Sequence, residues 1–419
     1  EKVRVGFDDL WSGSECPECP KGKLYPMLAP AVMVRIVGMS PLHATVIERD
    51  RMRCNLCGEM RTAPAPEGVG TEKYDETVPA MVGLLKYGTG TPFFRLEQLQ
   101  KHLGIPMPAS TQWKLVNEAS ETLEPVFDEL IQQAAQAQVI HNDDTTMKLL
   151  DRPDLQRKGK KTRTAVYTSG IVAKLSGRII ALFRTGMKHA GENLALVLMH
   201  RAAELAKPIQ MCDALSANTA GEVGVLDTIL AHCLTHARRR FVDVVDSFPD
   251  ECRHLLETLG VVYRNDALTK DMPPGKRLEF HQIHSSPPME ELRLWLRDQL
   301  EGRKTEPHSS LGKAITYMLK HWVELTLFLR DGLAPLDNNL CERVLKRAIL
   351  HRKNALFYKT QKGARVGDIF MSLIHTAELN HANPFQYLVT LLRNPALVEE
   401  NPEEWMPWNY RETLAGLPR

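Results

Sequence analysis

The sequence predicts a mixed α/β core that carries a helical insertion and is preceded by a metal-binding segment and a helical segment. Three observations indicate this fold class: strand-like and helical patterns alternate between residues 138 and 247, two C-x-x-C pairs lie near the start, and a helix with an early carboxylate follows much later. At 419 residues the chain exceeds what one hydrophobic core usually organises. We therefore expect several domains, with boundaries at 1–70, 71–137, 138–247, 248–333, 334–392 and 393–419.

The composition is that of a globular protein, with 43% hydrophobic and 25% charged residues. A formal net charge of +2 excludes a uniformly basic DNA-packaging protein, so any nucleic-acid surface must be local. No apolar run reaches the roughly 20 residues that span a bilayer, and no secretion signal opens the chain. We expect a cytoplasmic protein with no membrane partner. The chain begins at Glu1, without an initiator methionine, and we expect further sequence upstream.

The first segment, 1–70, contains two C-x-x-C pairs, Cys16 with Cys19 and Cys54 with Cys57. Four thiolates suit tetrahedral zinc and leave no open position for catalysis, so the pairs predict a structural Zn²⁺ site. The apolar stretch at 30–47 alternates, and we expect it to form strands between the pairs. The alternatives are two disulfides or a redox-active pair, which a cytosolic chain without a nearby parallel-sheet pattern disfavours.

The second segment, 71–137, has apolar residues at three- and four-residue spacing, first at 78–86 and again at 115–135. Between them the pattern is typical of a helix, a short glycine-containing turn and a second helix, for which Ser110 is a candidate N-cap. A recognition helix presents residues near its start to the major groove, and here these are Thr111, Gln112 and Lys114. The segment is predicted to be a helix-turn-helix-like DNA-binding region, although an ordinary helical hairpin has the same pattern.

The core begins with a strand at 138–146 that carries adjacent acids. Two further strands, a helix and a short fourth strand follow, at 164–173, 178–184, 190–206 and 208–214. This order is that of the ribonuclease H topology, in which the first and fourth strands lie side by side. Acids on these two strands, Asp143 and Asp213, are then expected to face a shared metal site.

A third carboxylate completes a site for two Mg²⁺ ions, which are hard cations that take oxygen ligands. Glu342 is the best candidate, because Asp337 or Asn338 can cap a helix and place Glu342 in an early turn. Taken alone, each of the 51 acidic residues is more often a cap, a turn residue or a solvated side chain. The placement of three acids, two of them at strand ends, is what indicates catalysis.

The chain between the second and third acids is too long for an uninterrupted core. Charged amphipathic runs at 290–299 and 312–330 fit the helices of an insertion at 248–333. Between the second and third acids, but before this insertion, Cys233 and His236 form a C-x-x-H pair. Two ligands cannot complete a tetrahedral zinc site, so we interpret them as a buried cysteine and a hydrogen-bonded helix histidine.

Basic residues gather near the same acids. Between Asn338 and Val366 eight Lys or Arg residues stand against one acid, which predicts a phosphate partner. A second basic cluster lies at 157–163 and a third at 238–240, and for the former a solvated loop is the alternative. The residues expected to contact the DNA backbone are Arg239, Arg343, Lys346, Arg347, Arg352, Lys353 and Lys160.

Several motifs occur together along the chain. Besides the two C-x-x-C pairs they are His141-Asn-Asp-Asp-Thr-Thr, Met211-Cys-Asp-Ala, Cys233-Leu-Thr-His-Ala-Arg-Arg-Arg-Phe, Asp337-Asn-Asn-Leu-Cys-Glu-Arg, His351-Arg-Lys-Asn-Ala-Leu-Phe and Met406-Pro-Trp-Asn. In this combination the chain resembles the bacterial insertion-sequence-66-type transposases of the DDE superfamily. The resemblance covers nearly the whole chain, from Cys16 to Trp408.

The resemblance implies a ribonuclease H-like core in which Asp143, Asp213 and Glu342 hold two Mg²⁺ ions, for which Mn²⁺ can substitute. Strand alternation puts Asp143 and Asp144 on opposite faces, and the family pattern selects Asp143. The implied chemistry is hydrolysis at the ends of the mobile element, followed by transfer of the freed 3′-hydroxyl ends into target DNA.

The implied partners are the terminal inverted repeats, target DNA, a second copy of the chain and small companion proteins of the element, in the bacterial cytoplasm at the nucleoid. A metal-dependent nuclease of the same fold and a noncatalytic, domesticated DNA-binding regulator are the alternatives.

Overall fold

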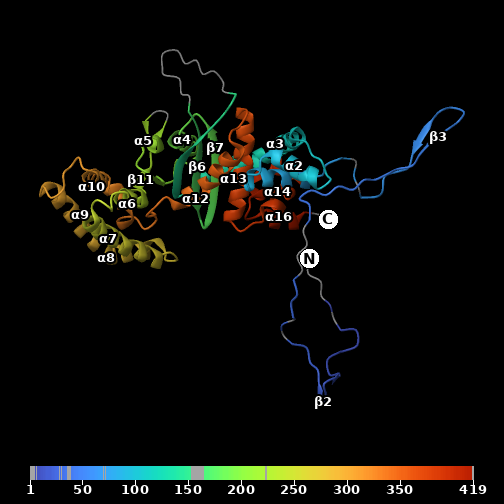
Figure 1. Cartoon of the computed structure of the whole chain (residues 1–419), viewed down its shortest axis with the longest axis horizontal. Coiled ribbons are helices and arrows are strands. Elements are labelled where there is room, and N and C mark those ends of the chain that lie inside the picture. The colour runs from blue at the N-terminus through green and yellow to red at the C-terminus, as the bar shows by residue number, and fades with distance from the viewer. Residues whose placement is uncertain are drawn as a thin grey trace. The chain divides into compact units, whose positions relative to one another are not determined.

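The computed structural model describes residues 5, 7–27, 29, 31–34, 39–68, 70, 72–151, 165–221 and 224–417. The chain divides into two compact units, Glu1–Pro41 and Leu42–Arg419. All helices of the described residues, and the large sheet, belong to the second unit (Figure 1). In the described part of the chain, no helix combines the length and the apolar character that crossing a membrane requires.

Each unit contains one small antiparallel hairpin that carries a C-x-x-C pair. The strands are β1 (Glu15–Cys16) and β2 (Cys19–Lys23) in the first unit, and β3 (Arg51–Arg53) and β4 (Met60–Thr62) in the second. Cys54 and Cys57 lie in the turn between β3 and β4. That turn closes through Gly58, whose φ of 76° a glycine adopts without steric cost.

The prediction of strands at 30–47 is wrong for the residues that the structure describes. Positions 31–34 and 39–50 contain no strand. Apart from buried Leu42, most of their apolar side chains are exposed, with 80% of Val32, 92% of Met33 and 85% of Val46 accessible. An alternating pattern stabilises a strand when one face packs against a core, and these side chains face solvent instead.

Four helical elements precede the sheet: α1 (Thr77–Gly83), the π-helical turn η1 (Leu84–Gly88), α2 (Phe93–His102) and α3 (Ala109–Ala135). The prediction of Ser110 as the N-cap is wrong, because α3 already begins at Ala109 after Pro108. The backbone N–H of Ala109 donates to Oε2 of Glu97 on α2 at 3.1 Å. The 27-residue helix α3 packs against α1, α13 and β6, so it shares a hydrophobic core with the sheet.

The central sheet has five strands in the order β11-β8-β5-β6-β7. They are β5 (Val139–Met147), β6 (Val166–Leu175), β7 (Arg178–Gly186), β8 (Ile209–Cys212) and β11 (Ile229–His232). β5, β6 and β7 pair antiparallel, whereas β5 with β8 and β8 with β11 pair parallel. The predicted adjacency of the first and fourth core strands is therefore confirmed. The sequence did not predict β11, because four residues are too few to display an alternating pattern.

Short elements connect these strands: α4 (Ala190–Leu198), α5 (Ser216–Thr219), and a small hairpin of β9 (Ala220–Gly221) and β10 (Gly224–Val225). α4 ends at Leu198, earlier than the predicted 190–206 helix. His189 and Glu192 form a capping box at its start. α5 follows directly after β8 and so lies next to Asp213.

The insertion is helical, as the sequence predicted. Its elements, with the preceding α6, are α6 (Leu234–Val242), α7 (Pro249–Leu268), α8 (Pro274–His284), α9 (Ser286–Glu301), α10 (Ser310–Lys320), α11 (Trp322–Leu325) and the 3₁₀ turn η2 (Leu327–Leu329). They build a second hydrophobic core together with Ile209, Met211 and Ala231 of the sheet. Val139 joins this second core while its neighbour Ile140 joins the first, as expected for strand alternation.

The chain returns to the sheet through α12 (Asn339–Ala355) and α13 (Gln361–Leu379), and ends with α14 (Pro384–Arg393), α15 (Pro395–Glu400), the 3₁₀ turn η3 (Pro402–Trp405) and α16 (Tyr410–Gly416). α12 packs on β5 and β6. The last elements close over α3, and the hydroxyl of buried Tyr387 donates to the carbonyl of Trp405 at 2.9 Å. The C-terminal segment therefore completes the first core.

α13 lies along the edge strand β7 and satisfies its free backbone N–H groups. Four polar side chains, each four residues from the next, accept from alternate β7 residues: Asp368 from Thr185, Ser372 from Phe183, Thr376 from Ala181 and Asn380 from Ile179. Four helical residues rise about 6 Å, close to the rise of two strand residues, so the two periods match. The edge of the sheet is thereby closed to further strands.

Candidate active site

Asp143 and Asp213 lie at the same level on neighbouring parallel strands. The register pairs His141 of β5 with Met211 of β8, and each aspartate follows two residues later. Burial raises the pKa of Asp143 to about 6, and the negative charges of Asp213 and Asp144 act in the same direction. The two acids that the sequence selected on these strands are thus brought together.

Asn218 of α5 ties the two aspartates to the sheet. Its Nδ2 donates to Oδ1 of Asp213, and its side chain also hydrogen-bonds Asp143, which partly offsets the rise in the pKa of that carboxyl. Its carbonyl accepts from Asn142 at 2.9 Å and from Gln210 at 2.7 Å. This buried amide network fixes α5 against the strand ends. Asn218 is not predicted from the sequence, in which its position five residues after Asp213 is the one available signal.

Asp144 faces away from this pair and serves a structural purpose. Its Oδ1 accepts from Ser169 of β6 at 2.7 Å, and its Oδ2 accepts from the backbone N–H of Ala190 and lies 2.9 Å from Nδ1 of His189. The carboxylate therefore holds the start of α4 against the sheet. Of the two adjacent acids, only Asp143 remains available beside Asp213.

Glu342 lies in the first turn of α12, as predicted, and Asn338 is the N-cap residue. Buried Asn338 joins this turn to β5: its Oδ1 lies 3.1 Å from Nδ1 of His141, and its Nδ2 donates to the carbonyl of Asn142 at 3.2 Å. Asp337 accepts from the N–H of Asn339 at 3.1 Å. Burial raises the pKa of Cys341 well above its ordinary value, and the negative charges of Asp143 and Glu342 act in the same direction.

Glu342 also completes a cluster with the C-x-x-H pair. The ligand atoms of Cys233, His236 and Glu342 all lie within 4.8 Å of one another. Cys233 is buried and His236 lies on helix α6, as predicted, but the predicted hydrogen bond of the histidine is not found at Nδ1 among the described residues. Nδ1 of His236 lies 3.8 Å from Oε1 of Glu342, and neither buried atom has a hydrogen-bond partner in the described structure. Burial raises the pKa of Cys233 to about 11, so its thiol is protonated at neutral pH. Asp143, Asp213 and Glu342 do not form such a cluster among the described residues.

A pocket of about 320 Å³ opens beside Asp213. Its lining includes His236, Arg239 and Arg240 of α6 and Tyr317 of α10. The guanidinium of Arg240 lies 3.9 Å from the centre of the Tyr317 ring, a cation–π contact that holds both side chains at the pocket. The pocket combines the acids Asp213 and Asp243 with the positive charge of Arg239 and Arg240, and the two arginines suit a phosphate group of a ligand.

The predicted DNA-contacting residues on α12 have different environments. Arg343, Lys346 and Lys353 are exposed, whereas Arg347 forms an ion pair with Glu378 at 3.3 Å. Arg352 donates to the hydroxyls of Thr145 and Thr146 at 3.1 and 2.6 Å, next to the end of β5. Arg239 is exposed at the pocket. Lys160, with the whole 157–163 cluster, lies outside the described residues.

Near the start of α3, one of the three predicted DNA contacts is wrong. Gln112 is fully buried, and its Nε2 donates to the carbonyls of Met107 at 2.9 Å and Phe93 at 3.2 Å. It fixes the turn between α2 and α3 and cannot reach a base. Thr111 is half-buried, and exposed Lys114 lies 3.8 Å from Glu118.

All eight cysteines are free thiols in the structure, so the alternative of disulfides between the C-x-x-C pairs finds no support. Backbone N–H groups of Cys57 and Leu56 lower the pKa of Cys54 to about 7. A turn of this kind stabilises a thiolate, which is the form that binds zinc. The two pairs belong to different units, and a four-cysteine zinc site remains a prediction.

The chain is similar to one protein family and to several known proteins. The profile of the family described as Transposase IS66 family matches residues 73–366. The chain is 26% identical over 398 residues to the uncharacterized protein y4jD of Sinorhizobium fredii (strain NBRC 101917 / NGR234), covering 88% of this chain and 73% of that protein. Two further uncharacterized proteins of the same organism are similar: y4hP, 27% identical over 404 residues with 90% and 70% covered, and y4qI, 24% identical over 351 residues with 81% and 64% covered.

Proposed function

Because the chain belongs to the IS66 transposase family, we propose that it cleaves DNA at the ends of a mobile element and joins the freed 3′-hydroxyl ends to target DNA. The core is then ribonuclease H-like, and the catalytic acids are Asp143, Asp213 and Glu342. One observation carries the proposal: the parallel register of β5 and β8 sets Asp143 beside Asp213, while α12, which bears Glu342, packs on β5.

The three acids fit a divalent cation site. Asp143 and Asp213 repel each other and share Asn218, and an Oε1 of Glu342 is buried without a hydrogen-bond partner among the described residues. Cations would satisfy all three groups, and oxygen ligands of this kind suit Mg²⁺ or Mn²⁺. When bound, two such ions supply activation of the attacking hydroxyl and neutralisation of charge on the departing oxygen.

The chain's own residues orient the DNA and the acids. Asn218 fixes Asp213, and the hydrogen bonds of Asn338 hold the helix of Glu342 against β5. Arg239 and Arg240 at the pocket supply positive charge for a phosphate next to Asp213. The exposed Arg343, Lys346 and Lys353 extend this charge along α12. Together these groups would hold a DNA backbone across the acids.

The two C-x-x-C hairpins are proposed to bind structural zinc, as the lowered pKa of Cys54 supports. Terminal repeats, target DNA, a second copy of the chain and small companion proteins are the proposed partners. Thr111 and Lys114 are the proposed DNA contacts of the helix-turn-helix-like segment. Arg347 and Arg352 of α12 are proposed DNA contacts as well, and they would exchange their present partners for phosphate.

The test is an assay with Mg²⁺, a labelled element-end duplex and supercoiled target DNA. We expect nicking and joining by the natural chain, and a loss of at least about 100-fold in Asp213→Asn, because removing one metal-binding carboxylate removes charge stabilisation in the transition state. Asp246→Asn, which changes an exposed acid on the loop after α6, is the matched control and keeps full activity.

Other results would point to a different function. Cleavage that never leads to joining, with all DNA partners present, would indicate a nuclease of the same fold. Binding without metal-dependent cleavage would indicate a noncatalytic regulator. Equal activity in Asp213→Asn and in the natural chain would reject the proposed site.

A further inference from the structure

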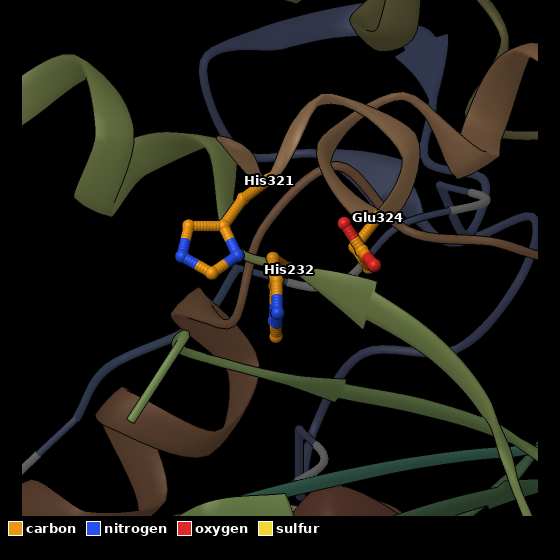
Figure 2. Close-up of side chains that lie close together, drawn as sticks. All are labelled: His232, His321 and Glu324. Atoms are coloured by element: carbon orange, nitrogen blue, oxygen red, sulfur yellow. The ribbon is translucent and has the colours of Figure 1, made fainter. Parts of the chain in front are cut away.

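A second cluster of potential metal ligands lies outside the proposed catalytic site. It consists of His232 at the end of β11, His321 directly after α10 and Glu324 in α11 (Figure 2). One ligand atom from each residue lies within 4.8 Å of the other two. The residues come from two distant parts of the sequence, with His321 and Glu324 three positions apart. None of them contributes to the set formed by Asp143, Asp213 and Glu342.

The cluster contains an unsatisfied polar atom. His232 is only 4% exposed, and its Nδ1 has no hydrogen-bond partner among the described residues. The ring of His321 stands nearly perpendicular to that of His232, at 83° with centroids 5.1 Å apart. No hydrogen bond or ion pair links the described side chain of Glu324 to either imidazole. Apart from this edge-to-face contact of the two rings, no hydrogen bond or ion pair among the described residues joins the three ligand groups.

The side chains also suit a cation by their chemistry. A neutral imidazole carries one nitrogen lone pair and is the metal-binding form of histidine. The remaining ligand, Glu324, is a half-buried carboxylate.

We propose that His232, His321 and Glu324 bind a divalent transition-metal ion, with Zn²⁺ as the preferred species. Two imidazole nitrogens and one carboxylate oxygen form a ligand set that zinc accepts, whereas Mg²⁺ prefers oxygen alone. Three protein ligands leave one position of a tetrahedral ion for water. This ligand set differs from the oxygen ligands of the proposed carboxylate site and from the thiolates of the C-x-x-C hairpins.

The position of the cluster suggests its purpose. His232 pairs with Cys212 in the sheet, and Cys212 immediately precedes Asp213. His321 and Glu324 belong to the helical insertion, and the ring of His321 lies 4.9 Å from that of Tyr317, which lines the pocket of Asp213. A metal ion would therefore bond the insertion to the strand next to Asp213 and fix the wall of the pocket. This role does not depend on the transposase proposal.

The experiment measures zinc bound by the full chain after dialysis against limiting Zn²⁺ with excess Mg²⁺, which occupies the carboxylate site. We expect His321→Ala and Glu324→Gln each to bind one zinc equivalent fewer than the natural chain. His308→Ala, which changes an exposed histidine of the insertion, is the matched control and loses none. Glu324→Gln keeps size and shape, and circular dichroism verifies that each variant is folded.

Cobalt substitution identifies the ligands independently. Thiolates give Co²⁺ an intense charge-transfer absorption that imidazole and carboxylate ligands lack. We expect His321→Ala to lose part of the ligand-field absorption while the thiolate band stays unchanged. Loss of one zinc in His236→Ala but not in His321→Ala would assign the metal to Cys233, His236 and Glu342 instead and overturn the proposal. Equal zinc content in folded Glu324→Gln and the natural chain would also overturn it. Since the readout is metal content, a failure here is distinguishable from a failure of DNA cleavage.

Discussion

At the scale of single residues, neighbouring acids have unlike roles because the strand turns their side chains to opposite faces. Asp143 faces Asp213, whereas Asp144 is occupied by Ser169, His189 and Ala190. Strand alternation predicts that the two acids face opposite sides of the sheet, and their hydrogen-bond partners show that Asp144 is the one that supports the fold.

The raised pKa of Asp143 predicts pH-dependent metal binding. Its folded value of about 6 exceeds the ordinary 3.8, so the folded state holds a proton more firmly than the unfolded chain between these values. This contribution to stability is complete below about pH 4 and is lost as the pH rises through about 6. A cation must displace the same proton, so the affinity for Mg²⁺ falls up to about tenfold for each pH unit below this value.

Calorimetric titration of the chain with Mg²⁺ or Mn²⁺ at several pH values tests this expectation. Asp143→Asn should bind weakly at every pH. Asp144→Asn should keep the pH dependence but lose about 1–3 kcal/mol of stability, because the amide keeps only one of the two oxygens that accept from Ser169, Ala190 and His189. A pH-independent affinity in the natural chain, or a stronger effect of Asp144→Asn on metal binding, would contradict the assignment of Asp143.

At the scale of elements, the pairing of α13 with β7 illustrates how a helix can complete a sheet edge. Each of the side chains at 368, 372, 376 and 380 accepts from one strand N–H, so the helix replaces a sixth strand. In the sequence these four residues look like polar interruptions of an apolar helix. Their function could not be predicted, because it depends on a strand almost 200 residues earlier.

Ser372→Ala tests this arrangement. The substitution leaves the buried N–H of Phe183 without an acceptor, which should lower the free energy of unfolding by about 1–3 kcal/mol. Denaturant unfolding measures the loss, and hydrogen exchange should be fastest at the Phe183 amide. Ser247→Ala, at an exposed position, is the control and should change neither quantity. An unchanged stability of Ser372→Ala would show that the hydroxyl is not needed at the edge of the sheet.

At the scale of the whole molecule, local patterns predicted the first three strands of the central sheet, the insertion helices and the α12 turn that bears Glu342. These features depend on residues close in sequence. The errors arose where distant segments decide the outcome: Gln112 is buried by the α2–α3 turn, β11 is a strand only because β8 lies beside it, and Glu342 meets Cys233 and His236 across the fold. Spacing along the chain predicts acids on strands, but not which polar groups share a cavity.

The two hydrophobic cores make a final prediction about how the insertion supports the proposed active site. Leu296 of α9 is fully buried in the second core, which includes Ile209 and Met211 just before Asp213. Leu296→Ala should destabilise this core by about 2–5 kcal/mol through lost contacts and a cavity. Because the same core holds the strand of Asp213, DNA cleavage should decline as well.

Hydrogen exchange distinguishes this linkage from a general loss of stability. Faster exchange should be confined to α7–α11, β8 and β11, while α3 and α13 of the first core stay protected. Leu294→Ala on the same helix is the matched control, since Leu294 is 57% exposed and contributes little burial. If Leu296→Ala accelerated exchange equally in both cores, the sheet would unfold as one unit with the insertion. The positions of Asp143 and Asp213 would then depend on the whole molecule and not on the second core in particular.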